Sequence, residues 1–206
     1  MKRLKTILKY IDNNDVIADI GCDHGYLIKL AIEEKNIVKG YAIDNKQGPL
    51  NSAINNLSMY NNVEFILSDG LKKVDSNDIN CVVIAGMGGM LINSIIDESI
   101  EKFNNIDKLI LCPNRNIDKV RLFLNENGFM IVDEDIIYED SKYYEILVVK
   151  KGYQKLSDKE LYFGHILLNK KNRYFINKWK EYYEKIKNIE NKIDEIKMIE
   201  EVLNES

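Results

Sequence analysis

The sequence predicts an α/β fold in which a mostly parallel sheet, covered by helices on both faces, is followed by a helical C-terminal region. Over the first 150 of the 206 residues, short β-type runs alternate with helical patterns, which is typical of a parallel sheet. The runs Cys81–Ala85 and Leu109–Leu111 are continuously apolar, as strands buried on both faces are. After Gly152 only helical patterns remain.

The predicted strands and helices follow one another in a regular order. A short N-terminal helix, with its apolar residues at helical spacing, precedes the first strand. The β-type runs are Val16–Ile20, Lys39–Ile43, Val63–Leu67, Cys81–Ala85, Lys108–Leu111, Phe129–Tyr138 and Tyr144–Val149. The helical stretches among the earlier runs are Tyr26–Glu34, Gly48–Met59, Gly89–Ser99 and Asp118–Asn127. Only the turn-like residues 139–142 separate the last two runs, so we predict an antiparallel hairpin at the sheet edge.

The C-terminal region predicts helices with a coiled-coil-like seam. Ser157 followed by Glu160 fits a capping box at the start of a helix. Farther on, apolar residues follow alternating steps of three and four, at Trp179, Tyr182, Ile186, Ile189, Ile193, Ile196 and Leu203, with Glu200 where another apolar residue is expected. The pattern is compatible with one long helix and with a hairpin that turns near Asn188–Asn191. We place a boundary at about residue 152, between a domain of residues 1–152 and a helical domain of residues 153–206.

The composition is that of a soluble globular protein, with 45% hydrophobic and 30% charged residues. No apolar run approaches the roughly 18 residues that span a bilayer, and no signal peptide is evident. The three cysteines are widely spaced, which favours free thiols in the cytoplasm, and no Cys/His cluster suggests a metal.

The net charge is −4, but residues 151–206 carry 12 basic and 10 acidic residues. Contact with nucleic acid would therefore depend on local patches. We expect a monomer.

The loop after the first predicted strand carries an acidic residue two places before a glycine. Asp19, Gly21 and Gly25 form the pattern D-x-G-x-x-x-G, whereas a dehydrogenase loop has G-x-G-x-x-G without that acid. A glycine turn between strand and helix lets the backbone approach a ligand closely. S-adenosylmethionine has no pyrophosphate, but it has a cationic amino acid end that a carboxylate can hold. The pattern therefore favours this cofactor.

Acidic residues also follow the second and third predicted strands. Asp44 lies 25 residues after Asp19, close to the offset of about 20 expected of a ribose-binding acid. Asp69 precedes Gly70, and an acid at this place can accept a hydrogen bond from the adenine amino group. Taken singly, these residues also fit a solvated strand end or a simple Asp-Gly turn. Together they lie where open α/β sheets bind ligands, so we predict one cofactor site.

The ends of the fourth and fifth predicted strands indicate where a methyl acceptor would lie. Three glycines within four residues, at Gly86, Gly88 and Gly89, indicate a sharp bend or a close ligand. The fifth strand runs into Asn114, whose side chain offers one acceptor and two donors for a planar heterocycle. A helix-entry turn and a loop asparagine after Pro113 are the simpler explanations.

Three motifs together resemble a known family. They are Asp-Ile-Gly-Cys-Asp-His-Gly-Tyr-Leu at residues 19–27, Ala-Gly-Met-Gly-Gly at 85–89 and Leu-Cys-Pro-Asn at 111–114. In this order they resemble the bacterial tRNA (adenine(22)-N1)-methyltransferase family. The resemblance extends to Lys2-Arg3-Leu4, to residues 144–148 and to residues 177–179. It implies a Rossmann-like class I methyltransferase fold that uses S-adenosylmethionine and acts on tRNA.

The resemblance and the strand-end pattern together define the predicted site. The cofactor-binding residues would be Asp19, Gly21, Asp44, Asn45, Asp69, Gly70, Ala85, Gly86 and Met87. The resemblance implies that Asp23 and His24 face the reaction centre, with Asn114 near the target base. His24 would orient Asp23 or contact RNA, and a purely structural role is the alternative. Residues predicted to bind RNA are Arg3, Lys5, Lys9, Lys170, Lys171, Arg173, Lys178 and Lys180. For the tail, the alternative is that these basic side chains are simply solvated.

The predicted reaction is methyl transfer to N1 of an adenine. The neutral base already has a lone pair at N1, so alignment with the methyl group is the main requirement. Methylation makes the base cationic, and Asp23 would stabilise the developing charge. Two other hypotheses remain: methyl transfer to another RNA position, to DNA or to a small molecule, and a non-enzymatic nucleotide-binding or interaction module.

Overall fold

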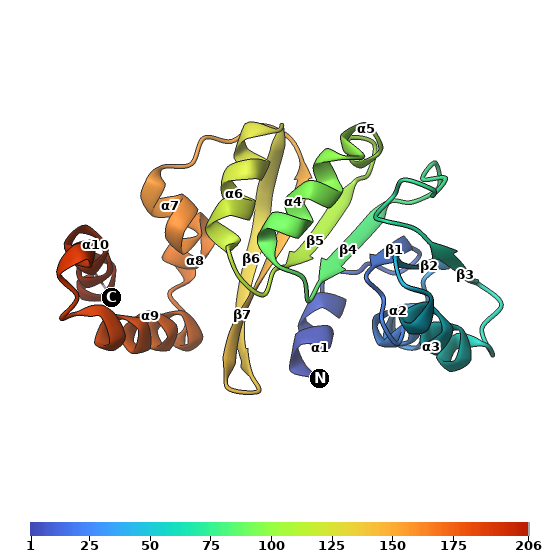
Figure 1. The fold of residues 1–206 in the computed structure, drawn as a ribbon, viewed down its shortest axis with the longest axis horizontal. Helices are drawn as coiled ribbons and strands as arrows, with labels where there is room; N and C mark the ends of the chain where they lie inside the picture. Colours follow the sequence, from blue (N-terminus) through green and yellow to red (C-terminus); the bar gives the residue numbers. More distant parts are fainter. Residues whose placement is uncertain (206) are drawn as a thin grey trace.

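The computed structural model describes residues 1–205 of the chain. Its centre is a seven-stranded sheet in the order β3-β2-β1-β4-β5-β7-β6 (Figure 1). The first five strands in this order are parallel, and β7 pairs antiparallel with both β5 and β6. The strands are β1 (Val16–Ile20), β2 (Lys39–Asp44), β3 (Val63–Leu67), β4 (Cys81–Ala85), β5 (Lys108–Cys112), β6 (Phe129–Glu139) and β7 (Lys142–Lys151). The predicted parallel sheet with an antiparallel edge is confirmed.

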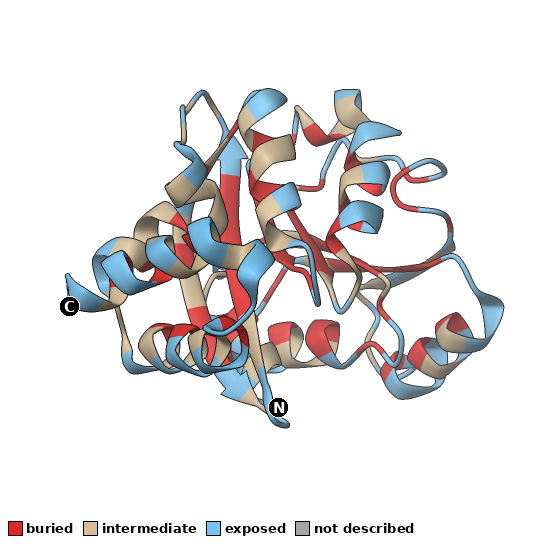
Figure 2. Cartoon of the chain, turned by 60° about the vertical axis from the view of Figure 1, so that its left-hand side comes forward, coloured by how far each residue is buried: buried red, intermediate tan, exposed pale blue. Residues whose placement is uncertain are grey.

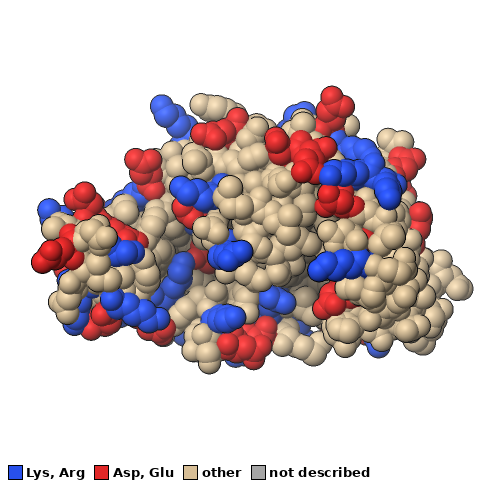
Figure 3. Space-filling view, in the orientation of Figure 1, with Lys and Arg blue, Asp and Glu red and all other residues tan. Residues whose placement is uncertain are grey.

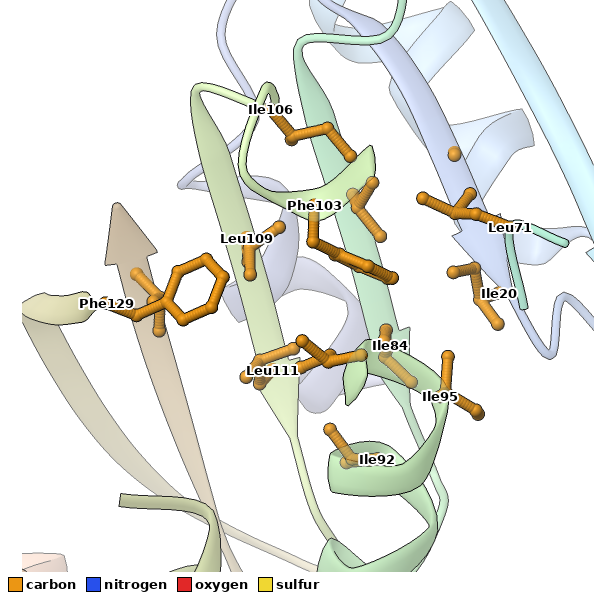
Figure 4. Close-up of a cluster of buried hydrophobic side chains, with 14 of the residues drawn as sticks. Ile20, Leu71, Ile84, Ile92, Ile95, Phe103, Ile106, Leu109, Leu111 and Phe129 are labelled. Atoms are coloured by element: carbon orange, nitrogen blue, oxygen red, sulfur yellow. The ribbon is translucent and has the colours of Figure 1, made fainter. Parts of the chain in front are cut away.

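Helices cover both faces of this sheet (Figure 1). One face carries α4 (Gly89–Asp97), α5 (Ile100–Phe103) and α6 (Ile117–Glu126), and the other carries α1 (Lys2–Leu8), α2 (Tyr26–Lys35) and α3 (Gln47–Leu57). Because successive strand residues point to opposite faces, Val82 and Ile84 enter one hydrophobic cluster while Cys81 and Val83 enter the other. Figure 4 shows the first cluster, where Phe103 lies over the strands beside Ile84. The continuous apolar run of β4 is therefore explained by burial on both faces.

The predicted elements agree with the structure to within one or two residues, apart from the short helix α5, which the sequence pattern did not indicate. The hairpin between β6 and β7 has the expected tight turn. Asp140 and Ser141 both adopt left-handed φ angles, 49° and 60°, which matches the twist of the flanking strands. The three cysteines are free and buried, as predicted. Within residues 1–205, no helix is long and apolar enough to cross a membrane.

The tail is a set of short helices that pack against the outer hairpin of the sheet (Figure 1). They are α7 (Asp158–Phe163), α8 (His165–Lys170), α9 (Arg173–Ile186) and α10 (Ile193–Asn204), with the 3₁₀ turn η1 (Glu190–Lys192) between the last two. The predicted capping box is present, since the Ser157 hydroxyl accepts the Glu160 N–H and the Glu160 carboxylate accepts the Ser157 N–H.

The structure does not confirm the predicted coiled-coil seam, although Trp179, Tyr182, Ile186, Ile196 and Leu203 do enter one hydrophobic cluster. The chain turns at residues 187–192, so α9 and α10 form a hairpin, one of the two forms that the pattern allowed. Ile189 and Ile193 of the expected seam are 41% and 54% exposed, whereas Ile199 and Val202 are buried. The turn interrupts the heptad repeat, and the helices bury side chains against β6, α7 and α8 as well as against each other. The outcome is a compact cluster of aromatic and aliphatic residues. Figure 2 shows how buried and exposed residues are distributed along the chain.

A buried ionic cluster joins this tail to the sheet. Arg121 of α6 is fully buried, and its guanidinium donates to Glu134 of β6 at 2.8 Å and to Glu145 of β7 at 2.6 Å. Lys178 of α9 forms an ion pair with Glu145, and Arg121 also donates to the carbonyl of Leu161 in α7 at 3.3 Å. The cluster therefore connects α6, both hairpin strands, α7 and α9.

The backbone closes tightly over the same cluster at Gly164. This residue has a φ angle of 90°, and a Cβ there would lie 2.5 Å from Arg121 Nη2 and 2.7 Å from Glu134 Oε1. A side chain at this position would collide with the paired charges. Burial alone would raise the pKa of Glu145, but Lys178 and Arg121 hold it below its ordinary value. The carboxylate therefore stays charged among its two cations.

Candidate active site

A cleft opens at the carboxyl ends of the parallel strands, where open α/β sheets bind ligands. Its volume is about 610 Å³, within the range of cofactor pockets. All of the residues predicted to bind cofactor or to act in catalysis line it, together with Arg3: Asp19, Gly21, Asp23, His24, Asp44, Asn45, Asp69, Gly70, Ala85, Gly86, Met87 and Asn114. The predicted convergence of the strand ends on one cleft is confirmed. The role of each residue is a separate question.

The loop after β1 is held open by its glycines and by β2. Gly21 and Gly25 have φ angles of 77° and 70°, and the N–H groups of Gly21 and Cys22 both donate to the Ile43 carbonyl, at 2.8 and 3.0 Å. A Cβ on Gly25 would lie 2.6 Å from Leu57 of α3. Glycine is therefore required both by the backbone conformation and by the close approach of α3 to this loop.

Asp19 is the most deeply buried acid of the cleft. It is 6% exposed at the end of β1. Burial, then repulsion from Asp44 and Asp23, raises the pKa of its carboxyl to about 7. The cleft thus concentrates negative charge that a cationic ligand would relieve. This arrangement fits the ammonium and sulfonium charges of S-adenosylmethionine better than it fits a pyrophosphate.

Asp44 and Asp69 differ in the contacts that their carboxylates already make within the protein. Asp44 is buried at the end of β2, and one of its carboxylate oxygens accepts the Lys46 N–H at 2.9 Å. Asp69 is about half exposed and forms an ion pair with Lys72 at 2.6 Å. Lys72 also pairs with Glu98. Lys72, which the sequence pattern did not single out, therefore competes for the Asp69 carboxylate that was expected to meet the adenine amino group.

Gly86 and Asn114 form the wall at the ends of β4 and β5. The Asn114 N–H donates to the Met87 carbonyl at 2.8 Å, and its side-chain amide donates to the Gly86 carbonyl at 2.6 Å. Since one N–H of the amide is used in this way, the oxygen and the second N–H of Asn114 remain for a ligand. A Cβ on Gly86 would meet nothing within 4 Å, and the φ angle of 80° favours glycine.

Asp23 and His24 lie at the mouth of the cleft and not in the core. Their side chains are 69% and 47% exposed. His24 Nε2 lies 3.7 Å from Asp23 Oδ1, which is too long for a hydrogen bond. The Asp23 backbone has a left-handed φ angle of 49°. His24 is therefore neither a core histidine nor a hydrogen-bonded support of Asp23.

Arg3 reaches the cleft because α1 is attached to the hairpin. The Glu139 carboxylate accepts the N–H of Arg3 at 3.2 Å, and it also contacts the Lys2 N–H and the amino group of Met1. These donors lower the pKa of Glu139 to about 2. The Arg3 guanidinium lies over the Tyr144 ring at 4.9 Å. Lys5 and Lys9 are exposed on the same helix, outside the cleft.

The basic residues of the tail fall into two groups. Lys170 and Lys178 are paired with Asp133 and Glu145, and Lys171 donates to the Val202 carbonyl at 3.1 Å. The structure thus gives these three a role in packing the tail. The other two, Arg173 and Lys180, are exposed. Figure 3 shows acidic and basic side chains intermixed over this face of the molecule.

Several lining residues were not predicted from the sequence. Apolar side chains close the cleft at Leu4, Pro49, Leu91 and Ile95. Their spacing matches that of core residues, so no sequence signal separates them from the core. Within residues 1–205, no group of three or more histidine, cysteine or acidic side chains is placed to hold a metal ion.

Comparison with known proteins agrees with this geometry. The family model described as tRNA (adenine(22)-N(1))-methyltransferase matches residues 17–205. The tRNA (adenine(22)-N(1))-methyltransferase of Bacillus subtilis strain 168 is 33% identical over 187 residues, covering 86% of this chain and 79% of that protein.

Solved structures share the whole fold. A Streptococcus pneumoniae protein in complex with S-adenosyl-L-methionine has a TM-score of 0.94 and 34% identity, covering 98% of this chain and 99% of that chain. Mycoplasma capricolum TrmK in complex with S-adenosyl-homocysteine has a TM-score of 0.87 and 28% identity, covering 99% and 97%. The family match covers far more than half of the sequence and includes the helical tail. This chain therefore belongs to the tRNA (adenine(22)-N(1))-methyltransferase family.

Proposed function

We propose that this protein transfers a methyl group from S-adenosylmethionine to N1 of adenine 22 in tRNA. The observation that carries the proposal is the convergence of Asp19, Asp44 and Asp69 on one cleft, with Asn114 and Gly86 on the adjoining wall. A purely structural module would have no need of two buried, mutually repelling carboxylates such as Asp19 and Asp44. We expect the enzyme to work as a monomer in the cytoplasm.

Each of the three strand-end acids would bind a different part of the cofactor. The Asp19 carboxylate would accept hydrogen bonds from the ammonium group at the methionine end of the cofactor. It is the most buried acid of the cleft, so a bound cation would stabilise its ionised form most. The Asp44 carboxylate would accept hydrogen bonds from the ribose hydroxyls. Asp69, with Asn45 and Gly70 in the same cleft, would accept a hydrogen bond from the adenine amino group. The cofactor supplies an electrophilic methyl group on its sulfonium.

Asn114 and Asp23 would act on the target base. A base buried in RNA must leave its stack to reach the cleft. The free oxygen of Asn114 would accept the exocyclic amino group of the adenine, which orients N1 toward the methyl group. Asp23, at the mouth, would stabilise the positive charge that develops on the methylated base. His24, exposed beside it, would contact RNA.

The RNA would cross the mouth of the cleft between α1 and the tail. Arg3, Lys5 and Lys9 are presented by α1, and Arg173 and Lys180 are exposed on α9. Phosphate contacts release counterions, so binding of tRNA should weaken steeply as salt rises.

Incubation of the purified protein with unmodified tRNA and a labelled methyl donor, followed by nucleoside mapping, tests the proposal. Label in 1-methyladenosine at position 22 supports it. Label at another nucleotide supports methylation of a different RNA position, and failure to bind S-adenosylmethionine in calorimetry leaves only the non-enzymatic hypothesis.

Asp23→Ala should bind S-adenosylmethionine like the wild type but turn over much more slowly. Asp23 is 69% exposed, so its loss should leave the fold intact. Loss of one electrostatic group aimed at a transition state costs about 10²- to 10³-fold in kcat. Single-turnover methylation of tRNA measures this effect. A rate like that of the wild type would refute the role given to Asp23.

Binding of S-adenosylmethionine should strengthen with pH. The pKa of Asp19 is raised to about 7, so the free protein holds a proton there below neutral pH, and a cation binds the ionised form. We expect the affinity to rise by about tenfold per pH unit below this pKa and to level off above it. Calorimetry at pH 5.5, 6.5 and 7.5 measures the trend, and an affinity that is constant across this range would contradict it.

A further inference from the structure

A second cavity, of about 320 Å³, lies between the start of α6, β7 and α9. Ten residues line it, and four of them are aromatic. Those four, which we call the aromatic cavity residues, are Tyr143, Tyr162, Trp179 and Tyr182. None of the residues that line this cavity belongs to the cofactor cleft.

The hydroxyl groups of the aromatic cavity residues are already bound within the protein. Tyr143 donates to Glu181 at 2.5 Å, and both Tyr162 and Tyr182 donate to Glu195. These bonds fix the rings in place, and the rings of Tyr162 and Trp179 lie 5.1 Å apart. The cavity therefore offers a pre-formed aromatic surface, with little hydrogen-bonding capacity left in the tyrosines. Such a surface suits a flat ligand that stacks.

The charges around the cavity argue against a phosphate. Lys178 is committed to Glu145, and the lining holds the two carboxylates of Asp118 and Glu181 with one other lysine, Lys185. Carboxylates repel an anion but accept hydrogen bonds from the amino groups of nucleobases. In addition, Trp179 Nε1 is buried and has no hydrogen-bond partner in residues 1–205. The indole N–H is thus a donor without an acceptor among the described residues, on a residue that lines the cavity.

The short loop between β5 and α6 contributes residues to the lining of both cavities. Asn114 lines the cofactor cleft, and Asn116, two residues later, lines the aromatic cavity. Two residues span at most about 7 Å. A separation of at most about 7 Å corresponds to one to two steps of a stacked nucleic acid strand, at about 3.4 Å per nucleotide. A strand that places one base at Asn114 therefore has its neighbours within reach of the aromatic cavity.

We propose that the aromatic cavity receives a second nucleobase of the tRNA, adjacent in the strand to the methylated adenine. This inference rests on the proposed function for the choice of RNA. The aromatic cavity lies where the sheet meets the tail. In this proposal it recognises a base of the substrate, whereas the exposed basic residues contact only phosphates. Stacking a neighbour here would hold the target base out of its helix during the reaction.

A pair of variants at Tyr143 tests the proposal. Tyr143→Phe keeps the ring and removes the bond to Glu181, whereas Tyr143→Ala removes the ring. We expect Tyr143→Ala to lower kcat/KM for tRNA by about 5- to 100-fold, since stacking on an aromatic ring is worth that much per base. Tyr143→Phe should stay within about twofold, and both variants should bind S-adenosylmethionine as the wild type does. Equal activity of Tyr143→Ala and the wild type would overturn the inference.

Trp179 gives a second measurement that needs no substitution. It is the single tryptophan of the chain and lines the cavity. Its emission should change on titration with unmodified tRNA, and a tRNA with 2-aminopurine next to position 22 should lose probe fluorescence on binding, except with Tyr143→Ala. If the wild type methylates position 22 but neither signal changes, the second-base proposal is wrong and the proposed function stands. If the wild type does not methylate tRNA at all, both fail.

Discussion

Asp19→Asn should abolish useful binding of S-adenosylmethionine while raising the stability of the free protein. Removing one partner of a buried charge pair costs about 2–5 kcal/mol of binding free energy, so the affinity should fall by about 30- to 4,000-fold. Asparagine has nearly the same shape, and Asp19 is 6% exposed at the end of a buried strand, so the cleft should persist. Calorimetric titration with the cofactor measures the loss.

The gain in stability follows from the raised pKa of Asp19. Its pKa is about 7 in the folded chain and about 3.9 in an unfolded one, so the folded state binds more protons between these values. Stability therefore falls as pH rises through this window, by up to about 4 kcal/mol in total. Asparagine carries no such penalty. The variant should melt several degrees higher than the wild type at pH 8, and the difference should disappear near pH 4.

A matched control is Asp107→Asn, which changes an exposed carboxylate ahead of β5. It should alter neither cofactor affinity nor the pH dependence of melting. If Asp19→Asn binds S-adenosylmethionine within a few-fold of the wild type, Asp19 is not the group that holds the cationic end. If it melts at the same temperature as the wild type at pH 8, the pKa of Asp19 is not raised by its burial and by the neighbouring Asp44 and Asp23.

Arg121→Met should destabilise the protein severely. The substitution removes the cation that two buried carboxylates share, and Glu134 and Glu145 are 0% and 5% exposed. Breaking a buried ion pair by removing one partner costs about 3–5 kcal/mol. For a chain of this size that corresponds to a fall in Tm of roughly 10 °C. Thermal unfolding followed by circular dichroism measures it.

The same experiment separates global from local effects. Lys119→Met, on the exposed face of the same helix, should change the free energy of unfolding by less than about 0.5 kcal/mol. Limited proteolysis of Arg121→Met should cut first after residue 152, because Arg121 contacts the carbonyl of Leu161 and shares Glu145 with Lys178. A Tm within about 2 °C of the wild type would show that the ionic cluster is dispensable.

The local patterns of the sequence predicted much of the fold and of the cofactor cleft. The β-type run Cys81–Ala85 is apolar throughout because both faces of β4 are buried. Burial on both faces can therefore be predicted from five consecutive residues. The acids at the strand ends could be found in the same way. Once the strands are parallel, their carboxyl ends must lie at one edge, so Asp19 and Asp44 had to converge.

What the sequence did not determine depends on pairs of residues far apart in the chain. Periodicity shows that α9 and α10 are helices, but the partners of Ile189 and Ile199 depend on where the chain turns. Likewise, Lys178 looks like a surface cation available to RNA until the fold brings it to Glu145, 33 residues away.

The sequence by itself determined the α/β architecture, the order of its elements and the sheet edge at which the cleft opens. Tertiary structure alone decided which charges are paired, which aromatic rings share a cavity and how the tail docks. The physical reason is the range of the interactions. Backbone preferences and the alternation of apolar residues act between near neighbours, whereas burial and electrostatic pairing of groups such as Arg121 and Glu145 depend on distances that exist only after folding.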